Sequence, residues 1–538
     1  MGGDADRVAH TLFLVALMGG VMVLSELLRS LSTWVRTAQS ELVQDYVAGL
    51  VHERSIAADL AFYEWPEFYD HLHRARQDAG QRPTALLEGT GSLAQNAITL
   101  IAMAAVLVPL DPWLPLALVG SMVPALYVVL HHGLRQYHWR LRTTADERRS
   151  WYYDWLLTDG ETAAELRLFG LGKHFAAAYQ AVRLRLRSER VRLVRDQSIS
   201  EVVAGAFALL VSAAATAWMV WKAAQGLVSL GDLAFFYQAF NQGQKLGRSL
   251  LDNVNRVYQS LLFLGNLFEF FDLQPKVVDP EEPELIRKGA APEIRFRNVT
   301  FRYPGSDRVA LRDFALTVPA GQIAAIVGPN GAGKSTVIKL LCRLYDPDSG
   351  SVEVDGTDVR NLRQEELRQQ TSVLFQQPVH YNSTVSENIA LGDLTAQPSA
   401  AEIEAAARAS GAAELIDRLP EGYDTLLGKW FVSGTELSVG EWQRIALARA
   451  FLRQAPLILL DEPTSAMDSW AEADWIKRFR SLAAGRTVII ITHRFTTAMR
   501  ADVIHVMAEG QIDESGRHDE LVALGGRYAQ SWEGQMSS

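Results

Sequence analysis

Residues 321–340 read GQIAAIVGPNGAGKSTVIKL, and this stretch decides the fold of the C-terminal half of the chain. A short apolar strand, Ile323–Val327, runs into a glycine-rich turn and then into an apolar-periodic helix. The turn fits the phosphate-binding pattern GxxxxGK[ST] at every fixed position. Glycines let successive backbone N–H groups converge on phosphate oxygens, and the helix N-terminus adds a favourable dipole. The pattern therefore predicts a nucleotide site.

The chemistry of this turn assigns roles to its last residues. Lys334 supplies a point charge for the β and γ phosphates of a nucleotide, and Ser335 supplies a hydroxyl for Mg²⁺. The residues of the turn that we expect to contact the nucleotide are Gly328, Pro329, Asn330, Gly331, Ala332, Gly333, Lys334, Ser335 and Thr336.

A second apolar strand ends in two carboxylates. Residues 457–462 read LILLDE, so Asp461 and Glu462 follow four apolar residues. We expect Asp461 to hold Mg²⁺ through water and Glu462 to orient or polarise the attacking water. The alternative is a pair of acids at the end of a strand that caps the next helix.

The composition excludes several classes of protein. The chain has 538 residues, of which 48% are apolar and 21% charged, so it is not a disordered chain. Its single cysteine, Cys342, excludes an internal disulfide framework and a cysteine-rich zinc site. The formal net charge of −10 argues against nucleic acid as a partner.

The N-terminal half carries apolar runs of membrane-spanning length. Residues 9–25, 89–110, 112–130 and 202–221 contain no Lys, Arg, Asp or Glu. Each run is close to the ~20 residues that a helix needs to cross ~30 Å of hydrocarbon. One such run is also compatible with a buried core helix, but four in one half of a chain favour membrane spans. The first run lacks a small-residue cleavage site, which argues against a signal peptide.

A fifth span is less apolar. Residues 233–271 carry apolar and polar stripes at helical spacing, which favours a long helix that is half embedded in the membrane and lines a polar cavity. The alternative is a cytosolic amphipathic helix. We therefore predict five spans, at about 9–28, 91–110, 112–132, 200–221 and 232–250.

Two long connections between these spans belong in the cytoplasm. Residues 131–198 hold 13 Lys and Arg, which favours this side by the positive-inside rule. Both connections, 29–92 and 131–198, contain aromatic and apolar clusters instead of the composition of a solvated loop. We therefore expect the membrane helices to continue into the cytosol and to turn at Tyr63–Tyr69 and Thr158–Glu161.

These observations define the expected architecture. Residues 273–293 are rich in proline and charge and are typical of a linker. The predicted fold is multidomain. An all-α transmembrane helix bundle with long cytoplasmic helical extensions occupies residues 1–272, and an α/β domain with the phosphate-binding loop occupies residues 294–538.

With its further motifs, the chain resembles a half-transporter of the ATP-binding cassette (ABC) exporter family over nearly its whole length. Tyr303 lies in FRYP, Gln376 in LFQQP and His493 in ITHR. The resemblance implies that Tyr303 stacks on adenine, that Gln376 reaches the metal, and that His493 contacts the γ-phosphate. An ordinary strand tyrosine and a structural histidine are the alternatives. Ser465 and Asp468, in SAMD, resemble the loop that follows the catalytic acid.

The family signature LSGGQ is present in altered form. The resembling segment is Leu437-Ser438-Val439-Gly440-Glu441. The resemblance implies that Ser438 and Gly440 bind the γ-phosphate of a nucleotide held by another subunit, so that the chain must dimerise. Val439 and Glu441 replace the usual Gly and Gln. We expect these two residues to weaken the site without abolishing it.

The membrane half departs from the family pattern as well. Exporters of this family have six membrane helices per half, and the five predicted here align as the second to the sixth. The first helix is apparently missing, which places Met1 outside the cell. A truncated or wrongly assigned start is the explanation that we favour.

The resemblance implies a function but no substrate. The first hypothesis is an ATPase of the plasma or inner membrane, multi-pass with its nucleotide-binding domain in the cytoplasm, which exports a peptide, lipid-linked or drug-like molecule as a dimer of half-transporters. ATP and Mg²⁺ are the implied cofactors. The alternative is a weakly catalytic or regulatory subunit of a heterodimer. A soluble ABC ATPase of DNA repair or translation is disfavoured by the membrane spans and the acidic charge.

Overall fold

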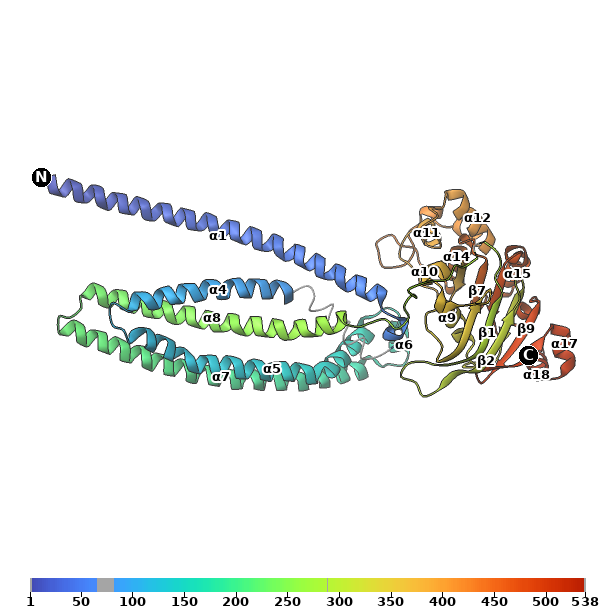
Figure 1. Ribbon diagram of the computed structural model, residues 1–538, viewed down its shortest axis with the longest axis horizontal. Helices are drawn as coiled ribbons and strands as arrows, with labels where there is room; N and C mark the ends of the chain where they lie inside the picture. Colours follow the sequence, from blue (N-terminus) through green and yellow to red (C-terminus); the bar gives the residue numbers. More distant parts are fainter. Residues whose placement is uncertain (1, 65–81, 288, 537–538) are drawn as a thin grey trace. The chain divides into compact units, whose positions relative to one another are not determined.

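The computed structural model describes residues 2–64, 82–287 and 289–536, and the chain divides into two compact units (Figure 1). One unit is helical and comprises Met1–Ile56 and Tyr69–Leu273, while the other is α/β and comprises Ala57–Phe68 and Gln274–Ser538. The expected order, a helical bundle followed by an α/β domain, is confirmed.

Long helices build the helical unit. Figure 1 shows α4 running along α8 and α5 running along α7. Within the described residues, α1, α4, α5 and α7 are long and apolar enough to cross a membrane, whereas α8 falls outside this set because polar residues interrupt it. The helices are α1 (Gly2–Ala57), α4 (Arg82–Leu107), α5 (Leu114–Thr158), α6 (Ala163–Leu168), α7 (Gly172–Ala224) and α8 (Leu230–Phe271).

Small residues let α5 and α8 approach each other closely. A Cβ atom added to Gly243 would lie 2.7 Å from Leu118 Cδ2, and one added to Gly247 would overlap the Met122 side chain. Such approach between helices is the usual basis of packing in a membrane, where burial of apolar surface drives little association. The adjoining buried cluster consists of Leu107, Leu114, Leu118, Ala215, Met219, Phe236, Ala239 and Phe240.

A polar contact joins the short connection between α4 and α5 to α7. Asp111, between α4 and α5, accepts hydrogen bonds from Lys222 Nζ at 2.7 Å and from Trp218 Nε1 at 3.0 Å. At the other end, α5 ends at Thr158, the first residue of one predicted turn. Residues 65–69 of the other predicted turn lie outside the described residues.

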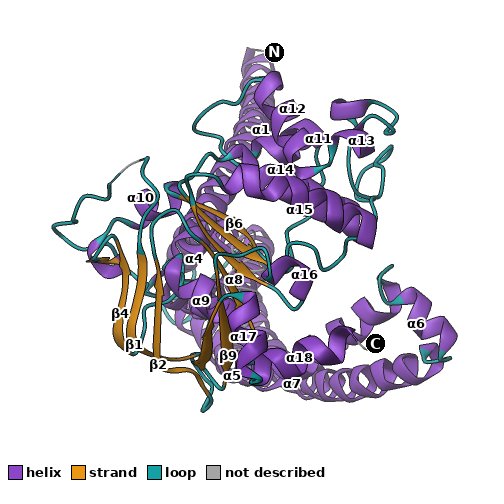
Figure 2. Ribbon diagram, turned by 90° about the vertical axis from the view of Figure 1, so that its right-hand side faces the viewer, coloured by secondary structure: helices purple, strands orange, loops and turns teal. Residues whose placement is uncertain are grey.

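Two sheets organise the α/β unit (Figure 2). The antiparallel sheet has the order β2-β1-β4-β5, and the larger sheet has the order β10-β9-β3-β8-β7-β6. The strands are β1 (Ile294–Arg302), β2 (Val309–Val318), β3 (Ile323–Val327), β4 (Ser349–Val354), β5 (Thr357–Asp358), β6 (Thr371–Leu374), β7 (Leu457–Asp461), β8 (Thr487–Ile491), β9 (Val503–Ala508) and β10 (Gln511–Gly516).

Helices surround these sheets. All side chains of β3, β7 and β8 are buried, as expected for central parallel strands that are covered on both faces. The helices of this unit are α2 (Leu60–Tyr63), α9 (Lys334–Leu341), α10 (Gln364–Gln369), α11 (Val385–Ala390), α12 (Ala400–Ser410), α13 (Ala413–Ile416), α14 (Val439–Leu452), α15 (Ser469–Ala483), α16 (Phe495–Ala498), α17 (His518–Leu524) and α18 (Arg527–Met536).

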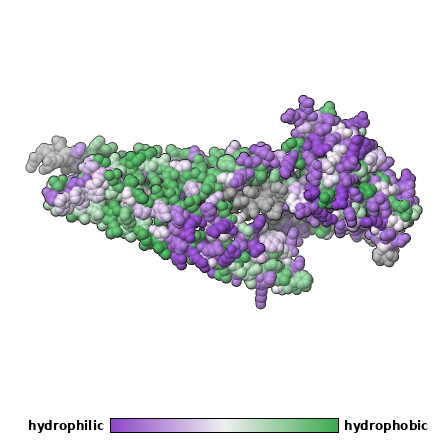
Figure 3. Space-filling model, turned by 60° about the horizontal axis from the view of Figure 1, so that its bottom comes forward, coloured by the Kyte–Doolittle hydropathy of each residue, from purple (hydrophilic) through white to green (hydrophobic). Residues whose placement is uncertain are grey.

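The surfaces of the two units differ in polarity. Figure 3 shows apolar residues over much of the bundle, whereas hydrophilic residues dominate the α/β unit. In the N-terminal part of α1 the apolar side chains are exposed, among them Leu12 and Phe13 at 64% each. Apolar surface of this kind is stable only against lipid or another protein. The distribution therefore agrees with a membrane environment for the bundle alone.

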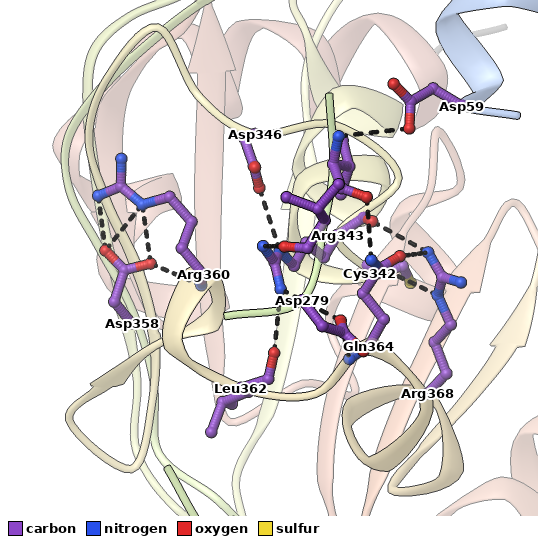
Figure 4. Close-up of polar contacts among 12 residues, drawn as sticks. Asp59, Asp279, Cys342, Arg343, Asp346, Asp358, Arg360, Leu362, Gln364 and Arg368 are labelled. Atoms are coloured by element: carbon purple, nitrogen blue, oxygen red, sulfur yellow. Dashed lines mark hydrogen bonds and ion pairs between the residues drawn. The ribbon is translucent and has the colours of Figure 1, made fainter. Parts of the chain in front are cut away.

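A buried arginine ties together the first half of the α/β unit (Figure 4). Arg343 is 2% exposed and follows the C-cap of α9 with φ +48°, a conformation that favours glycine. Its guanidinium donates to the Val278 carbonyl at 2.7 Å, the Leu362 carbonyl at 2.9 Å and Asp346 Oδ1 at 3.2 Å. These bonds join the segment before β1, the turn before α10 and the end of α9.

Replacing Arg343 with Met should destabilise this unit. The change leaves two carbonyls, of which that of Leu362 is buried, and one carboxylate without their donor, which we expect to cost about 2–4 kcal/mol. The unfolding temperature of the purified full-length chain, followed by thermal denaturation, should fall by several degrees. Arg408→Met removes an exposed partner of Glu404 and serves as the matched control, with little expected change. Equal unfolding temperatures in the two variants would contradict the anchoring role of Arg343.

Candidate functional site

Four neighbouring parallel strands carry the predicted site residues at their carboxyl ends. In the larger sheet β3 pairs with β8, β8 with β7, and β7 with β6. The phosphate-binding loop follows β3 and His493 follows β8, while Asp461 ends β7 and Gln376 follows β6. Since the carboxyl ends of parallel strands share one edge of a sheet, the fold brings these residues to the same edge.

The glycines of the phosphate-binding loop are required by close backbone contacts. Gly328 has φ +149°, and a Cβ atom there would overlap the Met507 carbonyl oxygen. Gly333 has φ +101°, and its Cβ atom would lie 2.5 Å from the Ala310 carbonyl oxygen. Only glycine combines these dihedral angles with this lack of space. The loop is therefore wedged against β2 and β9.

Lys334 is held inside the loop. It is 6% exposed, and its Nζ donates to the Gly328 carbonyl at 2.8 Å and to the Pro329 carbonyl at 2.9 Å. Burial lowers the pKa of Lys334, while the carboxylates of Glu462 and Asp461 act in the opposite direction. The ammonium group is thus positioned at the loop by its own backbone, beside the two acids that end β7.

The side chains at Ser335 and Asp461 fit a divalent cation. Burial raises the pKa of Asp461 and Glu462 adds to this rise, although a hydrogen bond with the Ser335 hydroxyl opposes it. Within the described part of the chain, the buried Asp461 Oδ1 has no hydrogen-bond partner. A hydroxyl beside an unpaired carboxylate oxygen is a suitable set of ligands for Mg²⁺. Gln376 is exposed after β6 and makes no hydrogen bond with the described residues.

Glu462 and His493 form a pair at the sheet edge. The Glu462 Oε1 to His493 Nε2 distance is 3.0 Å, so Nε2 carries the proton when the carboxylate is ionised. Burial and the charge of Lys334 lower the pKa of His493, while Glu462 opposes this shift. The imidazole is therefore neutral at neutral pH. Glu462 also has φ +51°, a strained angle for this residue type that is typical of functional sites.

One residue that sequence reasoning missed fixes the backbone of Glu462. Gln443 is 4% exposed on α14, and its Nε2 donates to the Glu462 carbonyl at 2.9 Å and to Ser465 Oγ at 3.2 Å. Its Oε1 accepts from the Ala466 N–H at 3.1 Å. A glutamine on the otherwise apolar buried face of the helix was the available signal.

A second missed group joins the segments that follow β7 and β8. Arg494 pairs with Glu472 and donates to the Ser465 carbonyl at 3.3 Å and the Met467 carbonyl at 3.1 Å. Asp468, predicted in the same loop, caps α15 by accepting from the Ala471 N–H at 2.8 Å. His493 and the SAMD loop are thus held by one network.

The altered signature forms the N-terminus of α14. Ser438 is the N-cap, and the Glu441 carboxylate accepts from the Ser438 N–H and from its hydroxyl, both at 2.8 Å. Burial alone would raise the pKa of Glu441, but these two hydrogen bonds outweigh it and the pKa is lowered. An anionic carboxylate therefore occupies the donors of Ser438 that were predicted to meet a phosphate.

The neighbours of Ser438 differ in burial and in the space around them. Leu437 is buried, whereas Val439 is 70% exposed. A Cβ atom at Gly440 would lie 2.6 Å from the Ala466 carbonyl oxygen, so this position needs glycine. The signature backbone is therefore pressed against the SAMD loop, and the Val439 side chain projects from it.

Tyr303, the predicted adenine contact, is tied to the phosphate-binding loop. Its hydroxyl lies 3.1 Å from Thr336 Oγ1, directly after Ser335. Its ring makes edge contacts with Phe301 and Tyr345 at centroid distances of 5.0 and 5.5 Å. The ring is half-buried, so part of its surface remains open to a ligand.

Known proteins share this organisation. Residues 311–465 match the ABC transporter family. The chain is 29% identical to the subtilin transport ATP-binding protein of Bacillus subtilis, over 96% of this chain and 83% of that protein. It is 33% identical to an ATP-dependent lipid A-core flippase of Alkalilimnicola ehrlichii, over 85% of this chain and 76% of the flippase.

A solved structure agrees with these relatives. The structure of a bacterial Atm1-family ABC exporter with ATP bound has a TM-score of 0.82 and 29% identity, and the match covers 93% of this chain and 86% of that one. With the phosphate-binding loop, the acids that end β7 and the membrane-type helices in place, the chain belongs to the family of ABC exporters, which are ATPases coupled to transport.

Proposed function

We propose that this chain exports its substrate as a dimer of half-transporters, with each ATP held between the phosphate-binding loop of one subunit and the signature of the other. The observation that carries the proposal is the Glu462–His493 pair, placed with Lys334 and Asp461 at one edge of the sheet. The exposed Val439 at the start of α14 supports a signature that faces a partner.

The geometry supports a division of labour in hydrolysis. The loop N–H groups and Lys334 bind the phosphates, and Tyr303 binds the adenine ring. Ser335, Asp461 and Gln376 would hold Mg²⁺, which would supply positive charge beside the phosphates. Glu462 orients the attacking water, and the His493 Nε2–H keeps the Glu462 carboxylate in place. Gln443 fixes the backbone on which Glu462 depends.

The helical unit is the proposed transport path. We place it in the plasma or inner membrane with the nucleotide-binding domain in the cytoplasm, because ATP is cytoplasmic and the long extensions are rich in arginine. A cavity of about 280 Å³ lies between α5, α7 and α8, and Gln244, Arg248, Asp252 and Glu201 are among the residues that line it. Ionisable residues at membrane depth mark the path of a polar substrate.

A second assignment is a weakly catalytic or regulatory subunit of a heterodimer. The observation that favours it is the Glu441 carboxylate, which occupies the donors of Ser438. ATPase activity of the chain purified alone separates the two assignments. A homodimer that hydrolyses ATP supports the first, and a chain that hydrolyses ATP only with a second half-transporter supports the other.

Replacing Glu462 with Gln should stop turnover and leave ATP binding intact. The amide keeps the shape of the side chain but cannot polarise water, and loss of such a group costs roughly 10²- to 10³-fold in rate. Steady-state hydrolysis and equilibrium binding of ATP by the purified chain measure the two effects. A hydrolysis rate within a few-fold of the wild type would remove Glu462 from the catalytic role.

Replacing Lys334 with Ala should weaken ATP binding itself. The phosphates lose the cation that the loop holds in place, and the loss of charge-assisted hydrogen bonds corresponds to roughly 10- to 100-fold in dissociation constant. Lys477→Ala, at an exposed position of α15, is the matched control. Equal affinity in the two variants would contradict the assignment of the loop.

Replacing Val439 with Gly and Glu441 with Gln together should raise the ATPase activity of a homodimer. The double change frees the signature of a branched side chain and of a negative charge, and glutamine can still complete the capping box with Ser438. Steady-state ATPase activity in detergent measures the effect, which we expect to be several-fold. A flat or lower rate would show that the surrounding residues are adapted to Val439 and Glu441.

A further inference from the structure

A short segment between two membrane helices is bound to the α/β unit. Ala57–Glu64 follows α1 but clusters with the α/β unit, and its Leu60 and Ala61 pack against the core of that unit. The Asp59 carboxylate accepts from the Lys276 N–H at 2.6 Å and the Val277 N–H at 3.3 Å. The segment is therefore fixed by both apolar packing and hydrogen bonds.

The partner of Asp59 is itself anchored, as Figure 4 shows. The Val277 carbonyl accepts from Gln364 Nε2 at 3.1 Å, and the Val278 carbonyl accepts from the buried Arg343. Residues 276–278 follow α8, so Asp59 joins the chain that leaves α1 to the chain that leaves α8. Both are held on one rigid part of the α/β unit.

The end of the segment reaches the nucleotide side of α9. Glu64 Oε1 lies 3.0 Å from Lys339 Nζ, and Lys339 is five residues beyond Lys334 on the helix that starts at the phosphate-binding loop. The same Lys339 ammonium lies over the Tyr303 ring, 4.9 Å from its centroid, and 5.7 Å from the Tyr345 centroid. Glu64 is thereby connected through one side chain to the predicted adenine contact.

The ion pair between Glu64 and Lys339 contributes to the nucleotide site through the position of its side chains and adds little to folding stability. The side chains of Lys339 and Glu64 are 28% and 37% exposed, and an ion pair with that exposure contributes little to folding stability. A cation over an aromatic face, by contrast, restrains both groups in a defined geometry. The Thr336 hydroxyl holds the other end of the tyrosine. The Tyr303 ring is therefore oriented by Lys339 on one side and by the loop on the other.

We propose that Glu64 and Lys339 are positioning residues of the nucleotide site, which orient Tyr303 for the adenine ring and link its affinity to the segment Ala57–Glu64. The proposal rests on the proposed role of Tyr303 in ATP binding. The base end of the site then depends on Glu64, whereas the phosphate end depends on the loop and on Asp461 and Glu462.

Single substitutions of Glu64 or Lys339 should weaken the binding of the adenine base and leave the binding of the phosphates unchanged. Glu64→Gln and Lys339→Met should each raise the KM for ATP by roughly 2- to 5-fold, the range that a cation–π contact supplies, with kcat nearly unchanged. Inorganic tripolyphosphate lacks a base, so its inhibition constant should stay at the wild-type value. The double variant should have the KM of either single variant, because both changes remove the same restraint.

Conservative variants and a matched pair serve as controls. Lys339→Arg keeps a cation for both the carboxylate and the ring and should retain a KM near that of the wild type. Glu404→Gln, which breaks the exposed pair with Arg408 on α12, should leave the KM unchanged. A variant that merely lost stability would instead lower the amount of active protein and the apparent kcat.

Two results would overturn the proposal. One is an unchanged KM for ATP in both Glu64→Gln and Lys339→Met. The other is an inhibition constant for tripolyphosphate that rises in parallel with the KM, because that would place the defect at the phosphates. The wild-type chain is measured first, and its failure to bind and hydrolyse ATP would instead refute the proposed function.

Discussion

The backbone of the phosphate-binding loop passes so close to β9 that residue 328 can carry no side chain. This contact at the Met507 carbonyl, with the similar one between Gly333 and β2, fixes the loop against the sheet. Lys334 is then buried against the loop carbonyls, and its charge lies beside the acids that end β7. Burial is the main cause of the pKa shifts of Lys334, Asp461 and His493, and the charges of Lys334 and Glu462 also act within this group.

The sequence predicted well those features that local chemistry determines. The pattern of apolar strand, glycine turn and helix at 323–341 requires particular dihedral angles, and the structure has them at Gly328 and Gly333. Apolar runs without charge predicted the membrane-type helices for a similarly local reason. The fifth predicted span was harder to identify from the sequence. Its helix, α8, mixes apolar and polar residues, so its mean hydropathy does not mark it as a membrane span.

Contacts between distant segments could not be predicted in the same way. Gln443, Arg494 and Asp59 each bond to residues that the fold brings near from elsewhere in the chain. Gln443 lies two residues beyond the signature in the sequence, but nothing in the sequence indicates that its amide reaches the Glu462 carbonyl. The same is true of Glu441. The sequence shows that this residue departs from the family pattern, but it does not show the hydrogen bonds that Glu441 makes with Ser438.

The hydrogen bonds between Ser438 and Glu441 use donors that the proposed ATP site also needs. As an N-cap, Ser438 must satisfy free N–H groups at the start of α14, and the Glu441 carboxylate completes that arrangement. In the proposed composite site, the same N–H group would also have to face a phosphate of the partner's nucleotide. Both acceptors are anions, so they cannot occupy the donors together without strong repulsion. In the proposed dimer, closure around ATP would therefore require the Glu441 side chain to move away from Ser438. That rearrangement would weaken the net binding of ATP, whereas a neutral glutamine would move away at a lower free-energy cost.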